Sequence, residues 1–302
     1  NCVFKNDSAF NGKGGAVLDG GGTTDEIVYI GGSEFYNNYG YQGGGAIHLY
    51  MDTALIENCI IDSNSSSIGG GGIYMYDGNA KFFNNALRYN YTESNGGGGI
   101  LIDNGNVTVE NCLLESNYTL DGGGGGINIW RDSVMISNSS IVRNSSAKRG
   151  GGINMAPDAA LYVLNTTISD NYAHLTGGGI NSTGMTGLDF VTISNNVSGE
   201  EGGGLNVFNP SWNPSDTCFI KNSIIANNFD STLTFPDIQD DSTVLVSAGY
   251  NFISNLGNYE FLHNNTGDFF GDTADITIPN EGAMKLIEIN DPKLGELQGQ
   301  PY

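Results

Sequence analysis

The sequence predicts an all-β protein built as a parallel β-helix, and the first observation behind this prediction is a glycine repeat. Glycine runs lead directly into short apolar segments along most of the chain, as in GGGGGINIW at residues 122–130. The last glycine before each apolar segment recurs every 25 to 30 residues, at Gly15, Gly45, Gly72, Gly99, Gly126, Gly152, Gly179 and Gly204. Such a fixed period is the signature of a solenoid, in which each repeat stacks on its neighbours.

The second observation is that each repeat contains three short segments of alternating apolar residues. In one repeat these segments centre on Ile73 and Met75, on Ala80 and Phe82, and on Leu87. Alternation with a period of two is typical of a half-buried strand. Three strands and three turns in about 27 residues predict one coil of a β-helix, and the whole array predicts about nine coils, roughly 45 Å long.

The third observation is that asparagine recurs at two positions of each repeat. The first series follows the second strand and the other follows the third strand, at Asn58, Asn84, Asn111, Asn138 and Asn165, and at Asn64, Asn90, Asn117, Asn144 and Asn171. Asparagine tolerates the left-handed backbone conformation, and its amide can bond to the same residue one coil away. We therefore expect both series to be structural ladders at corners of the coil. Glycine would supply positive φ and close backbone approach at the third corner.

Composition divides the chain and excludes some partners. Six of the seven prolines follow Val207, so we expect β-helix repeats over residues 1–228 and an irregular C-terminal coil, cap or linker over residues 229–302. The net charge of −22 disfavours nucleic acid as a partner, because such a surface repels phosphate groups. No apolar run is long enough for a transmembrane segment.

Two motifs resemble known surface proteins. Gly14-Gly15-Ala16-Val17 and Phe35-Tyr36-Asn37-Asn38 resemble the GGA[ILV] and FxxN passenger repeats of chlamydial polymorphic membrane proteins. The segments GYNFIS at 249–254 and DPKLGEL at 291–297 are similar to the ends of bacterial choice-of-anchor domain proteins. These resemblances imply a right-handed parallel β-helix of the pectin-lyase-like kind, secreted or displayed at the cell surface and often adhesive.

Asp62, Arg88 and Glu115 are the best candidates for catalysis. They hold one outward position on three successive predicted coils. Enzymes of the pectin-lyase-like group place carboxylates and a basic residue on one outer face, which this row resembles. Alternating acid, base and acid is also the simplest cross-strand salt-bridge ladder. The three histidines share no row, and the chain has neither a Ser-His-Asp order nor an HExxH motif.

Aromatic residues after the glycine runs are the candidate ligand-binding residues. Tyr74, Tyr76, Trp130 and Phe208 are expected to point outward. Such a stripe can stack on sugar rings or pack against another protein, although aromatic residues also favour strands intrinsically. The expected partners are a carbohydrate or a protein surface ligand, or other copies of the chain through the open coil ends.

Calcium is the one cofactor that the sequence suggests as a candidate. Asp77 and Asp103 fall in the turn between the first two strands of successive coils. Stacked carboxylates repel unless a cation or a hydrogen-bond donor lies between them, whereas aspartate is also an ordinary turn residue. No other cofactor is expected.

Asn106 and Asn264 are the preferred glycosylation acceptors, because they are the sequons best separated from the two asparagine series. Cys2, Cys59 and Cys112 hold one inward position in coils that are not adjacent, so these thiols are expected to be too far apart for disulfides. Cys218 lies on a different predicted strand, and we expect it to be unpaired as well.

Together these features predict an extracellular or cell-surface location and a non-enzymatic role as an adhesin, a structural stalk or a filament subunit. A polysaccharide lyase or glycoside hydrolase on the same scaffold is the alternative. An enzyme needs a polar cleft that crosses adjacent coils, whereas a scaffold needs only ladders.

Overall fold

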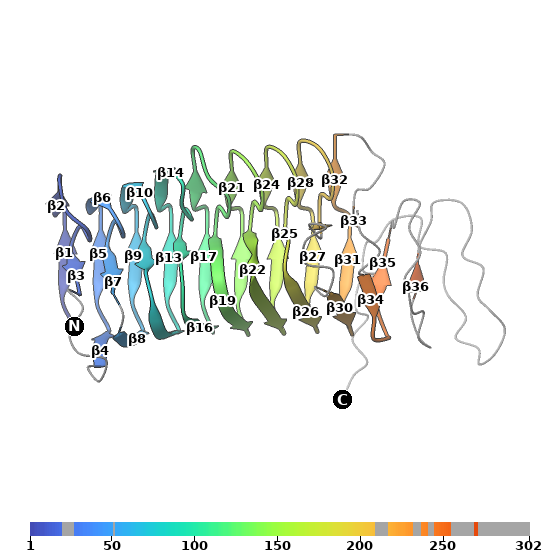
Figure 1. Ribbon diagram of the computed structural model, residues 1–302, viewed down its shortest axis with the longest axis horizontal. Helices are drawn as coiled ribbons and strands as arrows, with labels where there is room; N and C mark the ends of the chain where they lie inside the picture. The colour runs from blue at the N-terminus through green and yellow to red at the C-terminus, as the bar shows by residue number, and fades with distance from the viewer. Residues whose placement is uncertain are drawn as a thin grey trace, which may run out of the picture.

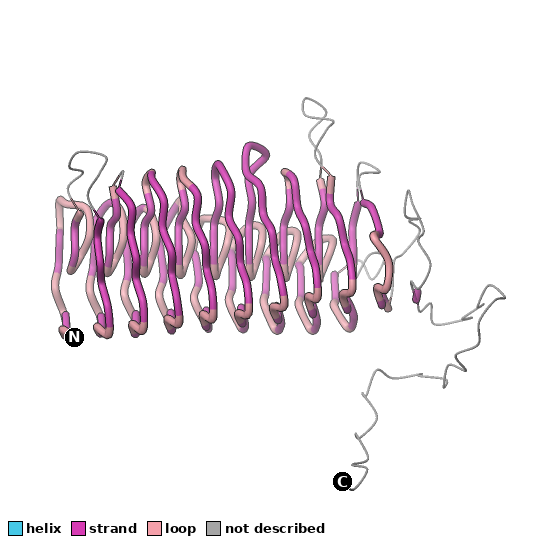
Figure 2. Tube along the Cα trace, turned by 90° about the horizontal axis from the view of Figure 1, so that it is seen from below, coloured by secondary structure: helices cyan, strands magenta, loops and turns pink. Residues whose placement is uncertain are grey.

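The computed structural model describes residues 1–19, 27–50, 52–208, 217–231, 237–240, 245–254 and 269–270. Every regular element in these residues is a β-strand, and every strand pairing is parallel. Successive coils lie side by side along one long axis and form a rod (Figures 1 and 2). The predicted all-β solenoid is confirmed.

Three sheets run the length of the rod. Sheet A contains β1 (Val3–Lys5), β5 (Glu34–Tyr36), β9 (Ile60–Asp62), β13 (Ala86–Arg88), β17 (Leu113–Glu115), β20 (Ser140–Val142), β23 (Thr167–Ser169), β27 (Thr192–Ser194), β31 (Ile224–Ala226), β35 (Phe252–Ile253) and β36 (Phe269–Phe270). Sheet B contains β2 (Ser8–Ala9), β6 (Tyr39–Gln42), β10 (Ser65–Ile68), β14 (Tyr91–Ser94), β18 (Tyr118–Thr119), β21 (Ser145–Ser146), β24 (Tyr172–Ala173), β28 (Val197–Ser198) and β32 (Phe229–Asp230). The nine strands of sheet B have eight turns of the chain between them, close to the predicted nine coils.

Sheet C contains two rows of strands. The first row consists of β3 (Val17–Leu18), β7 (Ile47–Leu49), β11 (Ile73–Met75), β15 (Ile100–Ile102), β25 (Ile180–Ser182), β29 (Leu205–Val207) and β33 (Ile238–Asp240). The second row consists of β4 (Ile27–Gly31), β8 (Asp52–Glu57), β12 (Gly78–Phe83), β16 (Asn106–Glu110), β26 (Met185–Asp189), β30 (Cys218–Lys221) and β34 (Leu245–Ser247). Two long strands, β19 (Ile127–Ser137) and β22 (Ile153–Leu164), run through both rows and join them. After residue 228, β33, β34 and β35 extend the same stacks.

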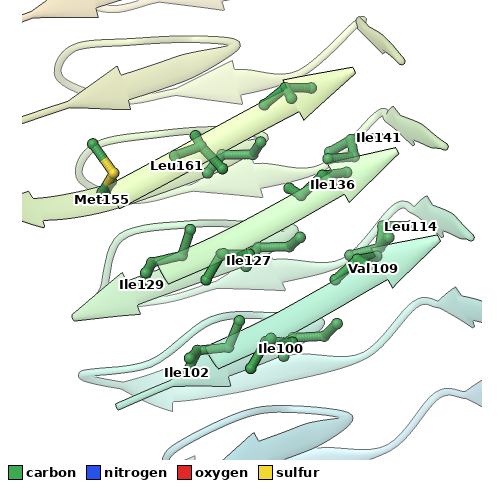
Figure 3. Packing of buried hydrophobic residues seen from close by; sticks show 14 of the residues in the cluster. Ile100, Ile102, Val109, Leu114, Ile127, Ile129, Ile136, Ile141, Met155 and Leu161 are labelled. Carbon is green, nitrogen blue, oxygen red and sulfur yellow. The ribbon is translucent and has the colours of Figure 1, made fainter. Parts of the chain in front are cut away.

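The core is one column of apolar side chains inside the coils. Ile73 pairs in register with Ile100 and Leu87 with Leu114, as the repeat predicts. Equivalent isoleucine, leucine and valine side chains of successive coils lie above one another inside the rod (Figure 3). Burial of this column is the main source of stability, because each coil covers the apolar face of the next.

The glycine runs are needed at the entry to sheet C for two separate reasons. In several runs a glycine before the last one carries positive φ, as at Gly124 (+69°) and Gly150 (+65°). The later residues approach the backbone of the next coil, so a Cβ at Gly152 would lie 2.7 Å from the carbonyl oxygen of Gly179. Positive φ and close approach to the next coil therefore fall on different glycines at Gly150 and Gly152, whereas Gly69 combines a φ of +125° with a Cβ position 2.3 Å from the carbonyl oxygen of Gly43.

One element of each coil was not predicted. The strands of sheet B, two to four residues long, follow the second asparagine series, where only a turn was expected. Such short strands leave no clear alternation in the sequence, and they form because the whole coil is held in register with its neighbours.

Candidate functional site

The candidate catalytic row forms on sheet A as predicted. Arg88 pairs in register with Asp62 on one side and with Glu115 on the other. Its Nε lies 3.4 Å from Oε2 of Glu115, whereas Oδ1 of Asp62 accepts a hydrogen bond of 2.6 Å from Ser63. Arg143 pairs with Glu115 from the following coil. Glu115 is therefore held between two guanidinium groups, which tie it to the coils before and after its own.

Arg143 was missed because the repeat pattern assigns it to a turn. It follows β20 with a φ of +57°, and its guanidinium reaches back one coil to Glu115. The only signal in the sequence is its spacing of 28 residues from Glu115, about one coil.

A shallow groove of about 550 Å³ lies beside this row, at the corner between sheets C and A. Its wall contains the amides of Asn58, Asn84, Asn111 and Asn138. Arg88 is the one charged residue among those that line it. Glycoside hydrolysis commonly requires a pair of carboxyl groups that flank the substrate, and this groove does not bring such a pair together.

The second asparagine series is buried and forms a continuous ladder. We call Asn38, Asn64, Asn90, Asn117, Asn144, Asn171, Asn196 and Asn228 the buried asparagine row, in which every residue is at most 3% exposed. In each step two donors, the backbone N–H and Nδ2, bond to Oδ1 of the asparagine one coil on; Asn90 donates to Asn117 at 3.0 and 2.9 Å. The last rung donates both bonds to the carboxylate of Asp237.

The first asparagine series forms the corner between sheets C and A. We call Asn58, Asn84, Asn111, Asn138, Asn165 and Asn222 the corner asparagine row; each has positive φ, between 45° and 56°. The members from Asn58 to Asn165 are exposed. Side-chain bonds join Asn84 to Asn58 and Asn165 to Asn138.

The prediction that both series occupy left-handed corners is right for the corner asparagine row alone. In the buried asparagine row the left-handed residue is the one before the asparagine, such as Tyr89, Ser116 or Arg143. The side chain of the asparagine itself then points into the coil, where its amide replaces the backbone bonds that the turn cannot make.

Three of the four candidate aromatic residues meet at one small cavity. Tyr74, Tyr76 and Trp130 line a space of about 190 Å³ where the first row of sheet C meets the glycine runs. Phe208, 44% exposed, follows β29 and does not line this cavity. Tyr74 is half-buried rather than fully outward, and burial together with the nearby Asp103 raises the pKa of its hydroxyl.

Two residues that were not singled out complete this aromatic cluster. Tyr50 stacks on Tyr76 with ring centres 4.7 Å apart and an angle of 7° between the planes. Lys13 Nζ lies 5.0 Å from the ring centre of Tyr50 and 5.8 Å from that of Tyr76. Stacked rings at equivalent positions of neighbouring coils could be found in the sequence, because Tyr50 and Tyr76 are 26 residues apart.

The outer face of the first row of sheet C is covered rather than open. His48, Leu101 and Asn128 point outward from this row, yet each is at most 3% exposed. The glycine runs fold over them: a Cβ at Gly97 would lie 3.0 Å from the backbone nitrogen of Asn128. A third asparagine ladder lies under this cover, at Asn128, Asn154, Asn181 and Asn206.

The turn aspartates are engaged by donors of their own and neighbouring coils. Asp77 accepts hydrogen bonds from Gly78 N and Asn104 Nδ2, and Asp103 accepts one of 3.0 Å from the Tyr74 hydroxyl. Arg131 lies 3.8 Å from Asp103. Over the described part of the chain, no three potential ligands gather in a metal-binding arrangement.

Asn106 is exposed at the start of β16, whereas Asn264 lies outside the described residues. All four cysteines are free thiols, with Cys2 exposed and the others buried. Burial raises the pKa of the Cys112 thiol to about 11, so the thiolate is disfavoured. The thiols of Cys59 and Cys112 accept bonds from backbone N–H groups one coil before, in a row where other coils use Ser33, Ser139 and Thr166.

Comparison with known proteins supports the fold. A family model described as a right handed beta helix region matches residues 1–141. No curated protein and no solved structure matches the chain. The described residues contain no helix long and apolar enough to span a membrane. The matched region and the stacked parallel sheets together identify the fold as a right-handed β-helix.

Proposed function

We propose that the chain is an extracellular, non-enzymatic surface protein that serves as an adhesin or as a structural stalk or filament subunit. A rod of coils in register holds side chains at fixed positions, as a binding surface or a spacer requires. The resemblance to surface-displayed repeat proteins supports the same location.

The observation that carries this proposal is that the side chains of the candidate catalytic row are already paired with one another or with neighbours. Glu115 forms ion pairs with Arg88 and Arg143, and Asp62 accepts a hydrogen bond from the Ser63 hydroxyl. The polar side chains that line the adjacent groove include asparagine amides and Arg88. A hydrolase or lyase needs an acid or base that is free to exchange a proton with the substrate. The row is better suited to holding neighbouring coils together.

The adhesin role is favoured over the stalk by the aromatic cavity. Aromatic side chains with polar neighbours around a hollow are typical of small-ligand sites. A spacer needs no such hollow, because its ladders and core already hold the coils together.

A polysaccharide lyase or glycoside hydrolase is the second candidate, because Arg88 lines the groove beside the candidate catalytic row. Among the described residues its Nε has no hydrogen-bond partner beyond the ion pair with Glu115. In such an enzyme the guanidinium would stabilise negative charge that develops in the transition state.

The deciding experiment replaces Arg88 with Met. The control is Lys81→Met, which breaks the Lys81–Glu110 ion pair of 2.8 Å away from the groove. We expect no cleavage of acidic or neutral polysaccharides by the parent, with or without calcium. Each variant should lose about 1 kcal/mol or less of stability, and less in high salt. Turnover by the parent that Arg88→Met abolishes at unchanged stability, and that Lys81→Met retains, would overturn the proposal.

A further inference from the structure

We propose that the cavity between Tyr76 and Trp130 binds a carboxylated sugar residue, with the sugar ring against the aromatic faces and its carboxylate at Lys13. This inference rests on the proposed adhesin function and names the ligand class for it.

The gap between the two rings follows from the repeat. Tyr76 and Trp130 hold the same position two coils apart, directly after Met75 and Ile129, and Asp103 takes that position in the coil between them. The carboxylate of Asp103 is drawn to the Tyr74 hydroxyl and to Arg131. A small side chain engaged elsewhere leaves open a space that an aromatic ring would fill.

The stacking of Tyr50 on Tyr76 makes one aromatic face available to this space. Their ring centres are 4.7 Å apart, which is close to the spacing of about 4.8 Å between neighbouring strands, so the two rings stack along the rod. One face of Tyr76 is thus covered by Tyr50 and the other faces the coil of Asp103. Two coils span about 10 Å, enough for one flat, saturated ring between Tyr76 and Trp130. The C–H faces of a sugar are apolar and pack well on aromatic rings.

The polar groups around the cavity favour an acidic sugar. Lys13, Gln42 and Asn95 belong to the lining and supply hydrogen-bond donors to hydroxyl and carboxylate oxygens. Five other basic side chains form ion pairs within the described residues, and Lys13 takes part in none of these pairs. An aromatic cavity can also select an organic cation, but the ammonium of Lys13 in the lining opposes a second positive charge.

The test is calorimetric titration of the protein with oligogalacturonate, oligoalginate and sialyllactose. Methyl-esterified oligogalacturonate and lactose are the neutral counterparts, and choline is the cationic one. We expect at least one acidic sugar to bind about tenfold or more tightly than its neutral counterpart, since a charged hydrogen-bond partner is lost in the ester.

Three variants test whether the sugar binds at this cavity or elsewhere on the protein surface. Trp130→Ala should reduce the affinity about tenfold or more, and Lys13→Gln should remove the preference for acidic over neutral sugars. Phe208→Ala, an exposed aromatic outside the cavity, should bind like the parent. Melting curves of all three variants show whether folding is retained. Because Lys13 is exposed, we expect Lys13→Gln to fold, so the test remains valid even if Trp130→Ala unfolds.

Glycan binding that neither Trp130→Ala nor Lys13→Gln changes would overturn this inference and leave the adhesin proposal standing. Choline binding that depends on Trp130 also overturns it, in favour of a cation site. The inference fails as well if none of the acidic sugars binds. The proposed function fails separately, if the parent cleaves any of the polysaccharides.

Discussion

In the buried asparagine row each side chain is shielded from solvent, and from Asn64 onward each accepts two hydrogen bonds from the preceding coil. In the corner asparagine row the side chains from Asn58 to Asn165 are exposed. The corner residues share a positive φ, and only some of their amides bond to one another. In the buried asparagine row the left-handed conformation falls on the preceding residue, even when that residue is Tyr89 or Arg143.

The two rows show that one amino acid repeated with one period can serve two physical purposes. The buried asparagine row is kept for the amide group, which no other side chain of that size can replace in a dry interior. The corner asparagine row is kept for a backbone conformation that asparagine and glycine tolerate best. Substitutions in the two rows should therefore follow different rules.

The largest expected effect is that of Asn117→Ala. The change removes the Oδ1 that accepts two bonds from Asn90, and it removes the Nδ2 donor to Leu87 O and to Asn144. Unpaired buried groups cost about 1 to 3 kcal/mol each, so a total loss of about 3 to 5 kcal/mol is expected in urea unfolding. A loss below about 1 kcal/mol would mean that the ladder adds nothing beyond the core.

His48 provides the opposite case, a buried polar side chain whose ring nitrogens form no hydrogen bonds to the described residues. Its ring is shielded from solvent, and this burial lowers the pKa of the imidazole to about 4, with the nearby Lys13 acting in the same direction and Asp19 against it. The unfolded chain, with a pKa near 6.5, binds the proton first as the pH falls. Stability should therefore drop between pH 6.5 and 4, by about 2 to 3 kcal/mol, and level off below that range.

Replacing His48 with Leu isolates this contribution, because Leu101 already occupies the same row. The difference in unfolding free energy between variant and parent should grow on acidification from pH 7 to 4. Parallel pH profiles for the two proteins would show that His48 does not titrate differently on folding.

In the corner asparagine row, Asn111→Val should cost about 1 to 2 kcal/mol, since a β-branched residue is strained at its φ of +54°. The side chain is exposed, so no lost contact adds to this cost. Thermal unfolding measures the effect, and an unchanged Tm would mean that the corner relaxes.

The smallest expected effect is a gain. Phe190 stands where the corner asparagine row has Asn165 and Asn222, with a φ of +55° and 58% of its surface exposed. Phe190→Asn should raise the unfolding free energy by about 0.5 to 1 kcal/mol, because asparagine tolerates this conformation better. A lower stability would show that the phenyl ring contributes a contact larger than the strain.

Much of the fold could be predicted because the repeat fixes register. The pairings of Ile73 with Ile100 and of Arg88 with Asp62 and Glu115 follow directly from residue spacing. The burial of His48 and Asn128 could not be predicted, because it depends on the path by which the glycine runs fold back over sheet C. Tyr74, Tyr76 and Trp130 were predicted as an outward aromatic stripe, but the cavity that they line was not predicted, because it depends on side-chain positions that alternation does not encode.

The most direct test of the difference between the two rows is to replace one residue in each with glycine and measure both by urea unfolding. Asn117→Gly removes an amide from a position where the backbone needs no glycine, and Asn111→Gly removes one from a left-handed corner. We predict a loss of about 3 kcal/mol or more for Asn117→Gly and a change within about 0.5 kcal/mol for Asn111→Gly. Equal losses in the two variants would contradict the assignment of one row to hydrogen bonding and the other to backbone conformation.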